Sequence, residues 1–242
     1  MSSVKDFRAG EVILIHKPLT WTSFQVVNKM KWLIKNHPSL VVDGKKVQPK
    51  IGHAGTLDPL ATGLLIVCTG KQTKSITSYQ AQEKEYTGTF YIGATTPCYD
   101  REKEIDAHFP TAHITSQMIY DTTSQFTGVI QQTPPLFSAI KIDGKRAYDI
   151  ARAGLTAEIK SKEIEIKIFE ITRIALPEVD FRVVCSKGTY IRSLARDFGE
   201  ALKSGAHLTA LCRTRIGEYQ LKDAMTIAEF EAALKADEAA HS

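Results

Sequence analysis

Residues 52–63 read Gly-His-Ala-Gly-Thr-Leu-Asp-Pro-Leu-Ala-Thr-Gly and run directly into the apolar segment 64–68. Glycines allow tight turns and close approach of the backbone to a ligand, while the Asp58-Pro59 pair restricts the local path. A rigid loop that presents one carboxylate, Asp58, beside a buried strand suits an enzyme that displays a nucleophile or a base. A solvated surface aspartate is the simpler interpretation, but the glycines, His53 and Pro59 around it favour catalysis.

The pattern of apolar residues outward from this loop predicts both strands and helices. Strands are expected at 11–15, 64–68, 86–93, 164–174 and 179–185, and helices from the Thr22 or Ser23 cap to residue 34, then at 71–79, 114–126, 146–152 and 190–202. These elements follow no regular βαβ rhythm. The sequence therefore predicts an α+β fold with a mixed, largely antiparallel central sheet flanked by helices.

The chain has no internal repeat, low-complexity tract or linker, so one main domain over residues 1–222 is the simplest division. Residues 36–50 carry a Pro, an Asp-Gly pair and three lysines, which predicts an inserted loop or hairpin. Asp143-Gly144 is a second turn signal. Residues 223–242 form an acidic tail in which Thr226 and Glu229 make the capping box of a short last helix.

The formal charge of +4 is unevenly distributed along the 242 residues. Residues 1–74 carry a net +7 and residues 129–222 a net +5, whereas 75–128 and 223–242 each carry −4. Two basic regions separated by an acidic one suit a polyanion lying across part of the surface. A protein that is merely well solvated would show a similar balance.

The four cysteines are far apart in sequence and form no Cys-x-x-Cys pair, so neither a zinc site nor a disulfide framework is expected. The N-terminus has no apolar signal segment, and no apolar run reaches membrane-spanning length. These features predict a cytoplasmic protein without a membrane partner.

Several common catalytic motifs do not fit the sequence. Gly70-Lys71 follows a strand, but six residues separate Gly63 from Gly70 and Gln72 replaces the hydroxyl that a P-loop needs. No dinucleotide-binding glycine pattern, histidine pair with metal-ligand spacing or serine nucleophile elbow occurs. Asp58 remains as the candidate, with no second catalytic carboxylate near it in sequence.

A second dense cluster, residues 185–197, passes from a strand through Lys187-Gly188 into a helix. Arg192 lies in the first turn of this helix, where a guanidinium can hold a carboxylate or a phosphate in a bidentate fork. The alternative is that Arg192 and Arg196 form exposed ion pairs with Asp197 and Glu200, which suits Arg196 better than Arg192.

Together the two clusters resemble the TruB-type tRNA pseudouridine synthases over roughly residues 9 to 220. The segments that carry the resemblance occur in the family's order: 52–63, Gly70, Thr73-Lys74, Lys84-Glu85-Tyr86, Ser138-Ala139-Ile140-Lys141, Ser186-Lys187-Gly188-Thr189-Tyr190-Ile191-Arg192 and Gly205-Ala206-His207-Leu208. The resemblance implies the pseudouridine synthase fold and conversion of uridine 55 in the tRNA T-loop to pseudouridine. It also implies that the reaction needs no metal, ATP or redox cofactor.

The resemblance assigns roles to individual residues. It makes Asp58 the catalytic aspartate, Arg192 its charged partner, and Tyr86 the aromatic ring that stacks on the target base. His53 matches the residue that fills the space left by the extruded uridine, and Tyr190 and Leu211 match residues of the uracil pocket. Candidate phosphate contacts are Lys17, Lys71, Lys74, Lys187, Arg213 and Arg215, which would make binding salt-sensitive.

Two departures from the family pattern stand out. Where family members usually continue into a PUA domain, the chain has only the net-acidic segment 223–242, so contacts with the acceptor arm are expected to be reduced or supplied otherwise. Residues 95–100 read Thr-Thr-Pro-Cys-Tyr-Asp instead of the usual Thr-Asp-Thr-x-Asp, which removes the first acid of that loop. The lysines of the 36–50 insertion suit either an extra RNA contact or, with slight preference, a tolerated surface loop.

The expected protein is a monomeric enzyme that acts on the T-arm of tRNA without an obligatory protein partner. A non-catalytic tRNA-folding factor that uses the same pocket is one alternative. Pseudouridylation of a uridine in another RNA is a second one.

Overall fold

The computed structural model describes residues 5–137, 141–142, 145–146 and 159–239, and divides the chain into two compact units. The first unit comprises Met1–Lys84 with Cys212–Ser242, and the second comprises Glu85–Leu211. This division differs from the predicted single domain over residues 1–222 with a separate tail, because the C-terminal segment belongs to the first unit.

The first unit is built on a sheet whose strands follow the order β1–β5–β14, with β4 paired to β5 and β15 to β14. The pairs β1/β5, β4/β5 and β14/β15 are antiparallel. Its elements are β1 Val12–Lys17, α1 Ser23–Ile34, η1 Pro38–Leu40, β2 Val41–Val42, β3 Lys45–Lys46, β4 Ile51–Ala54, β5 Ala61–Thr69, η2 Gly70–Ser75, α2 Ile76–Ala81, the last residues of β14 Ala206–Ile216, β15 Tyr219–Gln220, η4 Leu221–Asp223 and α6 Ile227–Ala239.

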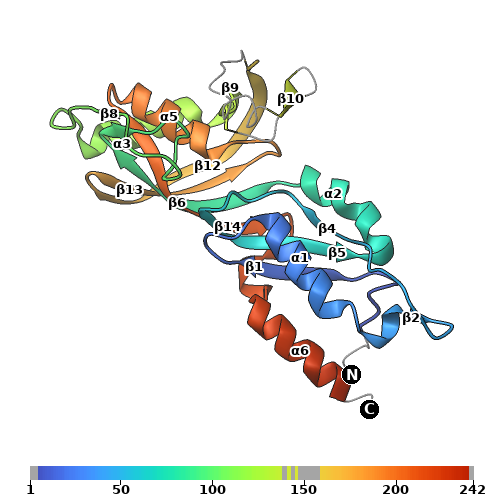
Figure 1. Ribbon diagram of the computed structural model, residues 1–242. Coiled ribbons are helices and arrows are strands. Elements are labelled where there is room, and N and C mark those ends of the chain that lie inside the picture. The colour runs from blue at the N-terminus through green and yellow to red at the C-terminus, as the bar shows by residue number, and fades with distance from the viewer. Residues whose placement is uncertain (1–4, 138–140, 143–144, 147–158, 240–242) are drawn as a thin grey trace. The chain divides into compact units, whose positions relative to one another are not determined.

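Alternation along β1 and β5 gives this sheet two buried faces. Ile15 and Leu65 pack on one face with the apolar side of α1 and with Phe230 of α6, whereas Leu64 and Ile66 pack on the other. Figure 1 shows α1 in blue and α6 in red beside β1. Helix α6 is therefore part of the core of the first unit.

The local signals in this unit are confirmed. The capping boxes at Thr22 and Thr226 are both formed, the second through reciprocal hydrogen bonds between Thr226 and Glu229. The 36–50 insertion contains η1 and the β2–β3 hairpin, in which Asp43 and Gly44 both adopt positive φ.

In the second unit the strand order is β14–β6–β13–β12–β9, and the registers of β12 with β13 and with β9 are antiparallel. Its elements are β6 Lys84–Ile92, β7 Ala94–Thr95, β8 Ala107–His108, α3 Ser116–Thr123, η3 Ser124–Phe126, β9 Gly128–Gln132, β10 Lys141–Ile142, β11 Lys145–Arg146, β12 Lys162–Ala175, β13 Glu178–Cys185, α5 Ile191–Ala201 and the first residues of β14. The alternation expected in 86–93 is confirmed, since Tyr86, Phe90 and Ile92 are buried.

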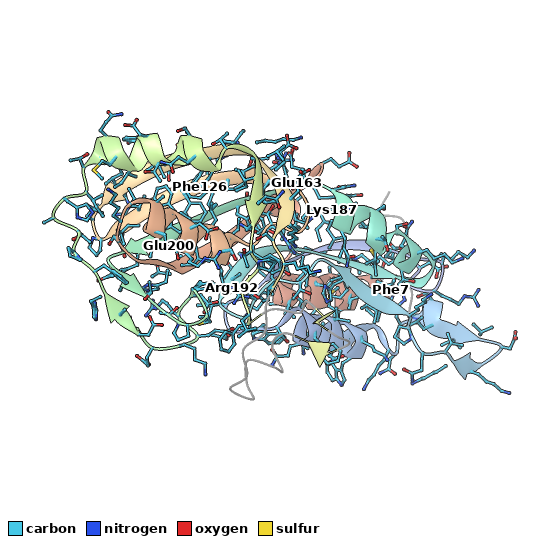
Figure 2. All side chains as sticks on the ribbon, turned by 90° about the horizontal axis from the view of Figure 1, so that it is seen from above. Phe7, Phe126, Glu163, Lys187, Arg192 and Glu200 are labelled. Carbon is cyan, nitrogen blue, oxygen red and sulfur yellow. The ribbon has the colours of Figure 1, made fainter. Side chains whose placement is uncertain are left out.

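Aromatic side chains dominate the core of the second unit. The ring of Phe90 stacks on Phe181 with centroids 4.2 Å apart, and Phe169 and Phe198 complete the cluster. Phe198 comes from α5, so this contact fixes the helix that carries Arg192 against the sheet. In Figure 2, Arg192 is labelled near one end of α5 and Glu200 near the other.

The α+β class and the largely antiparallel sheet flanked by helices are confirmed. Three of the earlier expectations concern residues outside the described part of the chain: the turn at 143–144, the motif residues 138–140, and the helix at 146–152, of which only Arg146 is described and belongs to strand β11. Strands β10 and β11 on either side of that turn do pair antiparallel. Within the described ranges, no helix is both long and apolar enough to cross a membrane.

Candidate functional site

Asp58 lies in a short loop between β4 and β5 of the first unit. The loop closes as a turn in which the Ala61 N–H donates to the Asp58 carbonyl oxygen, 3.1 Å away. Leu57 is buried, and its N–H donates to the Ser23 hydroxyl at 2.9 Å, which ties the loop to the start of α1. Asp58 itself is half-buried. A well-anchored backbone therefore carries the carboxylate.

Arg213 connects the two ends of this loop. Its side chain is 1% exposed, and its guanidinium donates to the Gly55 carbonyl at 3.0 Å and to the Leu64 carbonyl at 2.8 Å. Gly63 lies against the Arg213 backbone so closely that a Cβ there would be 2.3 Å from the Arg213 carbonyl oxygen. The glycine at 63 is thus required by the approach of β14 to β5.

Lys17 contacts the middle of the loop at Pro59. Its side chain is fully buried, and its ammonium donates to the carbonyl oxygens of Pro18, Trp21 and Pro59. Burial lowers the pKa of Lys17 to about 8; the nearby Asp58 carboxylate opposes this shift, and the Arg213 guanidinium adds to it.

These two placements correct the predicted phosphate contacts. Lys17 and Arg213 are enclosed and donate to backbone carbonyls, so neither presents its charge to a polyanion on the surface. The sequence predicted their charge but not their burial. Their observed role is to hold the loop that carries Asp58.

The remaining basic candidates are more accessible. Lys71 and Lys74 on η2 and Lys187 before α5 are exposed, so their ammonium groups face solvent. Arg215 is partly exposed and forms an ion pair with Glu83 at 2.7 Å. Their exposure is compatible with a phosphate contact, and the role of the three lysines stays a prediction.

His53 lies on β4, opposite Val67 of β5. Burial lowers its pKa, the Arg213 guanidinium lowers it further, and the Gly55 backbone partly offsets both effects. The ring is therefore neutral at pH 7. Its Nδ1 is buried and makes no hydrogen bond within the described part of the chain.

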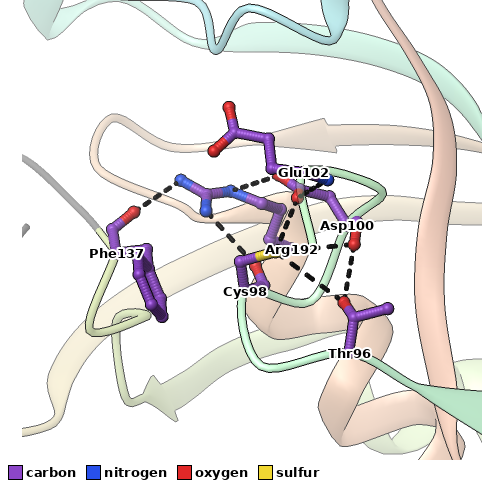
Figure 3. Close-up of polar contacts among 6 residues, drawn as sticks. All are labelled: Thr96, Cys98, Asp100, Glu102, Phe137 and Arg192. Atoms are coloured by element: carbon purple, nitrogen blue, oxygen red, sulfur yellow. Dashed lines mark hydrogen bonds and ion pairs between the residues drawn. The ribbon is translucent and has the colours of Figure 1, made fainter. Parts of the chain in front are cut away.

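Arg192 is buried at the start of α5 in the second unit. Its Nη1 donates to the Cys98 carbonyl at 3.2 Å and its Nη2 to the Phe137 carbonyl at 3.0 Å. Its Nε lies 3.5 Å from the Asp100 carboxylate. Figure 3 draws these contacts. Asp58 belongs to the other unit, so its pairing with Arg192 stays a prediction.

Three further predicted residues belong to the second unit. Tyr86 is buried on β6, Leu211 is half-buried on β14, and Tyr190 occupies the N-cap position of α5. The backbone of Tyr190 is fixed by two hydrogen bonds with the side-chain amide of Gln132. The Lys162 ammonium lies 4.6 Å from the centroid of the Tyr190 ring.

Comparison with known proteins identifies the family of the chain. Residues 44–191 match the model of the TruB family pseudouridylate synthase N-terminal domain, and residues 192–242 match that of the tRNA pseudouridylate synthase B C-terminal domain. The chain belongs to the TruB family. The predicted resemblance and the predicted enzyme class, a pseudouridine synthase acting on tRNA, are therefore confirmed.

The TruB relatives include full-length matches. tRNA pseudouridine synthase B of Flavobacterium johnsoniae is 62% identical over 231 residues, covering 96% of this chain and 99% of the relative. The enzyme of the same name from Phocaeicola vulgatus is 54% identical over 225 residues, covering 93% of each chain.

Solved structures show the same fold at lower identity. The match in a Cbf5-Nop10-Gar1 complex has a TM-score of 0.69 at 28% identity and covers 94% of this chain. The match in an H/ACA RNP bound to a substrate RNA containing 2'-deoxyuridine has a TM-score of 0.66 at 25% identity. The present chain spans 55% and 54% of those longer chains, respectively.

Four residues that contact predicted site residues were not identified from the sequence of this TruB member. Cys98 and Asp100 contact Arg192, and Gln132 and Lys162 contact Tyr190. For Asp100 a signal existed, because it is the acid retained at the end of the altered 95–100 pattern. For Gln132 and Lys162, which contact Tyr190, no local signal was available, since β9 and β12 bring them there from distant positions in the chain.

Proposed function

We propose that this TruB family member isomerises uridine 55 in the T-loop of tRNA, with the carboxylate of Asp58 as the reacting group. The observation that carries the proposal is the anchoring of the Asp58 loop. Arg213 holds both of its ends and Lys17 holds the Pro59 carbonyl next to Asp58. A catalytic group that must meet a reacting atom in a fixed position reacts faster when its backbone is held in place beforehand.

The chemistry is an internal rearrangement of the nucleotide. The bond from uracil N1 to the ribose C1′ breaks, the base turns, and a bond from C5 to C1′ forms while N1 gains a proton and C5 loses one. The atoms and electrons balance without a co-reactant, so the reaction needs no redox cofactor. A carboxylate at Asp58 can add to an electrophilic carbon or stabilise positive charge at C1′.

The target base must leave its stack to reach Asp58. Extrusion of a base takes a few kcal/mol, which an aromatic side chain in the vacated space partly offsets. His53, neutral at pH 7 because of its lowered pKa, is suited to this stacking role. Tyr86, Tyr190 and Leu211 are proposed to contact the uracil, and Arg192 to act as the charged partner of Asp58.

The test incubates the purified protein alone with an unmodified tRNA transcript and maps pseudouridine chemically. We expect pseudouridine at position 55 with wild type, none with Asp58→Asn, and wild-type levels with Asp43→Asn. Asp43 is a matched control because its carboxylate is exposed in the β2–β3 turn of the same unit. An active Asp58→Asn protein would refute the catalytic assignment.

The same experiment separates the alternatives. If the wild-type protein refolds a misfolded tRNA but leaves no pseudouridine in it, the protein is a folding factor. If other transcripts are modified and position 55 is not, the substrate is another RNA. Both outcomes contradict the proposed function.

A further inference from the structure

Residues 96–100 form a tight turn that faces α5 of the second unit. The Thr96 hydroxyl donates to the Asp100 carbonyl at 2.6 Å, and the Tyr99 N–H donates to the Thr96 carbonyl at 3.1 Å. Tyr99 adopts positive φ, and its carbonyl oxygen accepts from the Leu208 N–H of β14. The turn is thus closed on itself and fixed to the sheet. Figure 3 shows the contact between Thr96 and Asp100 that closes it.

The Asp100 carboxylate is buried in this turn and makes three contacts. Its Oδ1 accepts from the Glu102 N–H at 2.9 Å and lies 3.0 Å from the Cys98 sulfur. Its Oδ2 lies 3.5 Å from Nε of Arg192. A buried carboxylate needs such donors, because its lost hydration is not otherwise replaced.

The Cys98 thiol is the donor in its contact with Asp100. Burial raises the pKa of Cys98, and the hydrogen bond to Asp100 raises it further, so the sulfur keeps its proton at neutral pH. An ionised carboxylate only accepts hydrogen bonds. The sulfur lies 3.0 Å from Oδ1 and 3.5 Å from the Asp100 carbonyl oxygen, so we assign the thiol hydrogen to the nearer acceptor, Oδ1.

Cys98 also contacts the other member of the ion pair. Its backbone carbonyl accepts from Nη1 of Arg192 at 3.2 Å. One residue thus holds the guanidinium through its main chain and the carboxylate through its side chain. At 3.5 Å the ion pair is not tight enough to fix the carboxylate by itself, so its orientation depends on the two donors at Oδ1.

We propose that Cys98 is a positioning residue for the pseudouridine synthase reaction: its thiol orients the Asp100 carboxylate, which in turn holds the Arg192 guanidinium. The inference rests on the proposed role of Arg192 beside the catalytic aspartate. The competing explanation is that Cys98 is a small buried apolar residue, for which only its volume matters.

Two substitutions test the hydrogen-bond donor of the Cys98 side chain separately from its volume. Cys98→Ser keeps a donor and loses apolar volume, whereas Cys98→Val keeps apolar volume and loses the donor. Cys185→Ser and Cys185→Val, on buried β13 of the same unit, are matched controls. All variants are first compared by circular dichroism and thermal unfolding.

The measurement is the single-turnover rate constant on unmodified tRNA, together with the Kd for the same RNA. We expect Cys98→Val to lower the rate constant about tenfold, the scale of a lost hydrogen bond to a charged group, with Kd unchanged. Cys98→Ser should stay within about twofold of wild type by the same reasoning. If the rate constant of Cys98→Val equals or exceeds that of Cys98→Ser, the proposal is overturned.

A double-mutant cycle keeps the test decisive if Cys98→Val is unstable. The proposal expects Asp100→Asn to slow the reaction and Cys98→Ala to add little in the Asp100→Asn background. Independent, additive losses would overturn it. Activity of Asp58→Asn, measured in parallel, reports on the proposed function separately from Cys98.

Discussion

The guanidinium of Arg213 donates a hydrogen bond to the carbonyl oxygen of Gly55, 3.0 Å away. A second bond from the same side chain reaches Leu64, so one buried cation spans the whole loop that carries Asp58. The Arg213 side chain is 1% exposed, so loss of its guanidinium would leave the buried Leu64 carbonyl and the partly buried Gly55 carbonyl without this donor. The loop's shape therefore depends on a residue about 155 positions away in sequence.

We predict that Arg213→Leu lowers the free energy of unfolding by about 2–4 kcal/mol, since it removes the donor to the buried Leu64 carbonyl and to the partly buried Gly55 carbonyl. Urea unfolding followed by circular dichroism measures this. Arg215→Leu is the control: its ion pair with Glu83 is partly exposed, so the loss should be about 1 kcal/mol or less. Equal losses for the two variants would contradict a special role for Arg213.

Gly63→Ala is predicted to be more harmful than an alanine at another glycine with positive φ. At Gly63 a Cβ would be 2.3 Å from the Arg213 carbonyl oxygen, whereas at Gly44 no atom lies within 4 Å. Both have positive φ, +110 and +73, so backbone strain is present in each variant. We expect Gly44→Ala to lose about 1 kcal/mol and Gly63→Ala several times more. Comparable unfolding midpoints for the two variants would refute the predicted clash between an alanine at position 63 and the Arg213 backbone.

The lowered pKa of Lys17 predicts a pH dependence of stability. Folded Lys17 releases its proton near pH 8, and the unfolded side chain near its ordinary pKa of 10.5. Between these values the unfolded state binds more protons, so the contribution of this group to stability rises with pH. The free energy of unfolding of wild type minus that of Lys17→Met should therefore increase from pH 7.5 to 10. A flat or falling difference would contradict the burial of a charged amine.

The lowered pKa of His53 predicts that the protein loses stability at acid pH. Its pKa is lowered in the folded state, so below about pH 6.5 the unfolded state binds more protons and stability falls as pH decreases. Histidine ring signals in NMR should show a midpoint for His53 below 6.5, and His53→Gln should remove its part of the acid-side loss. A midpoint at or above 6.5 would show that the imidazole is not shielded by burial.

The parts of the fold that follow local rules could be predicted from the sequence. The caps at Thr22 and Thr226 and the alternation of buried side chains from Tyr86 depend on neighbouring residues and were found. The burial of Lys17 and Arg213 could not be predicted, because lysine and arginine are mostly exposed. Their enclosure results from contacts across the sheet and the β1–α1 connection, which no local pattern encodes.

The same reasoning applies to the candidate site. Asp58 and Arg192 were recognisable because each lies in a dense motif of glycines and polar residues. Asp100 and Cys98 become visible only once the turn at 96–100 is placed against α5. The charge of the phosphate candidates was evident, but their access to solvent was not, which leaves Lys71, Lys74 and Lys187 as the exposed ones.

The exposed lysines on η2 predict a salt-dependent contribution to RNA binding. If Lys71 and Lys74 each neutralise a phosphate, the double variant Lys71→Ala/Lys74→Ala should bind tRNA more weakly and reduce the slope of log Kd against log salt by about 1 to 2. Lys45→Ala/Lys46→Ala is the matched control, because it removes the same charge from the exposed β2–β3 hairpin. Filter binding at several salt concentrations measures both slopes. Equal reductions would mean that the RNA responds to overall charge and does not contact η2 specifically.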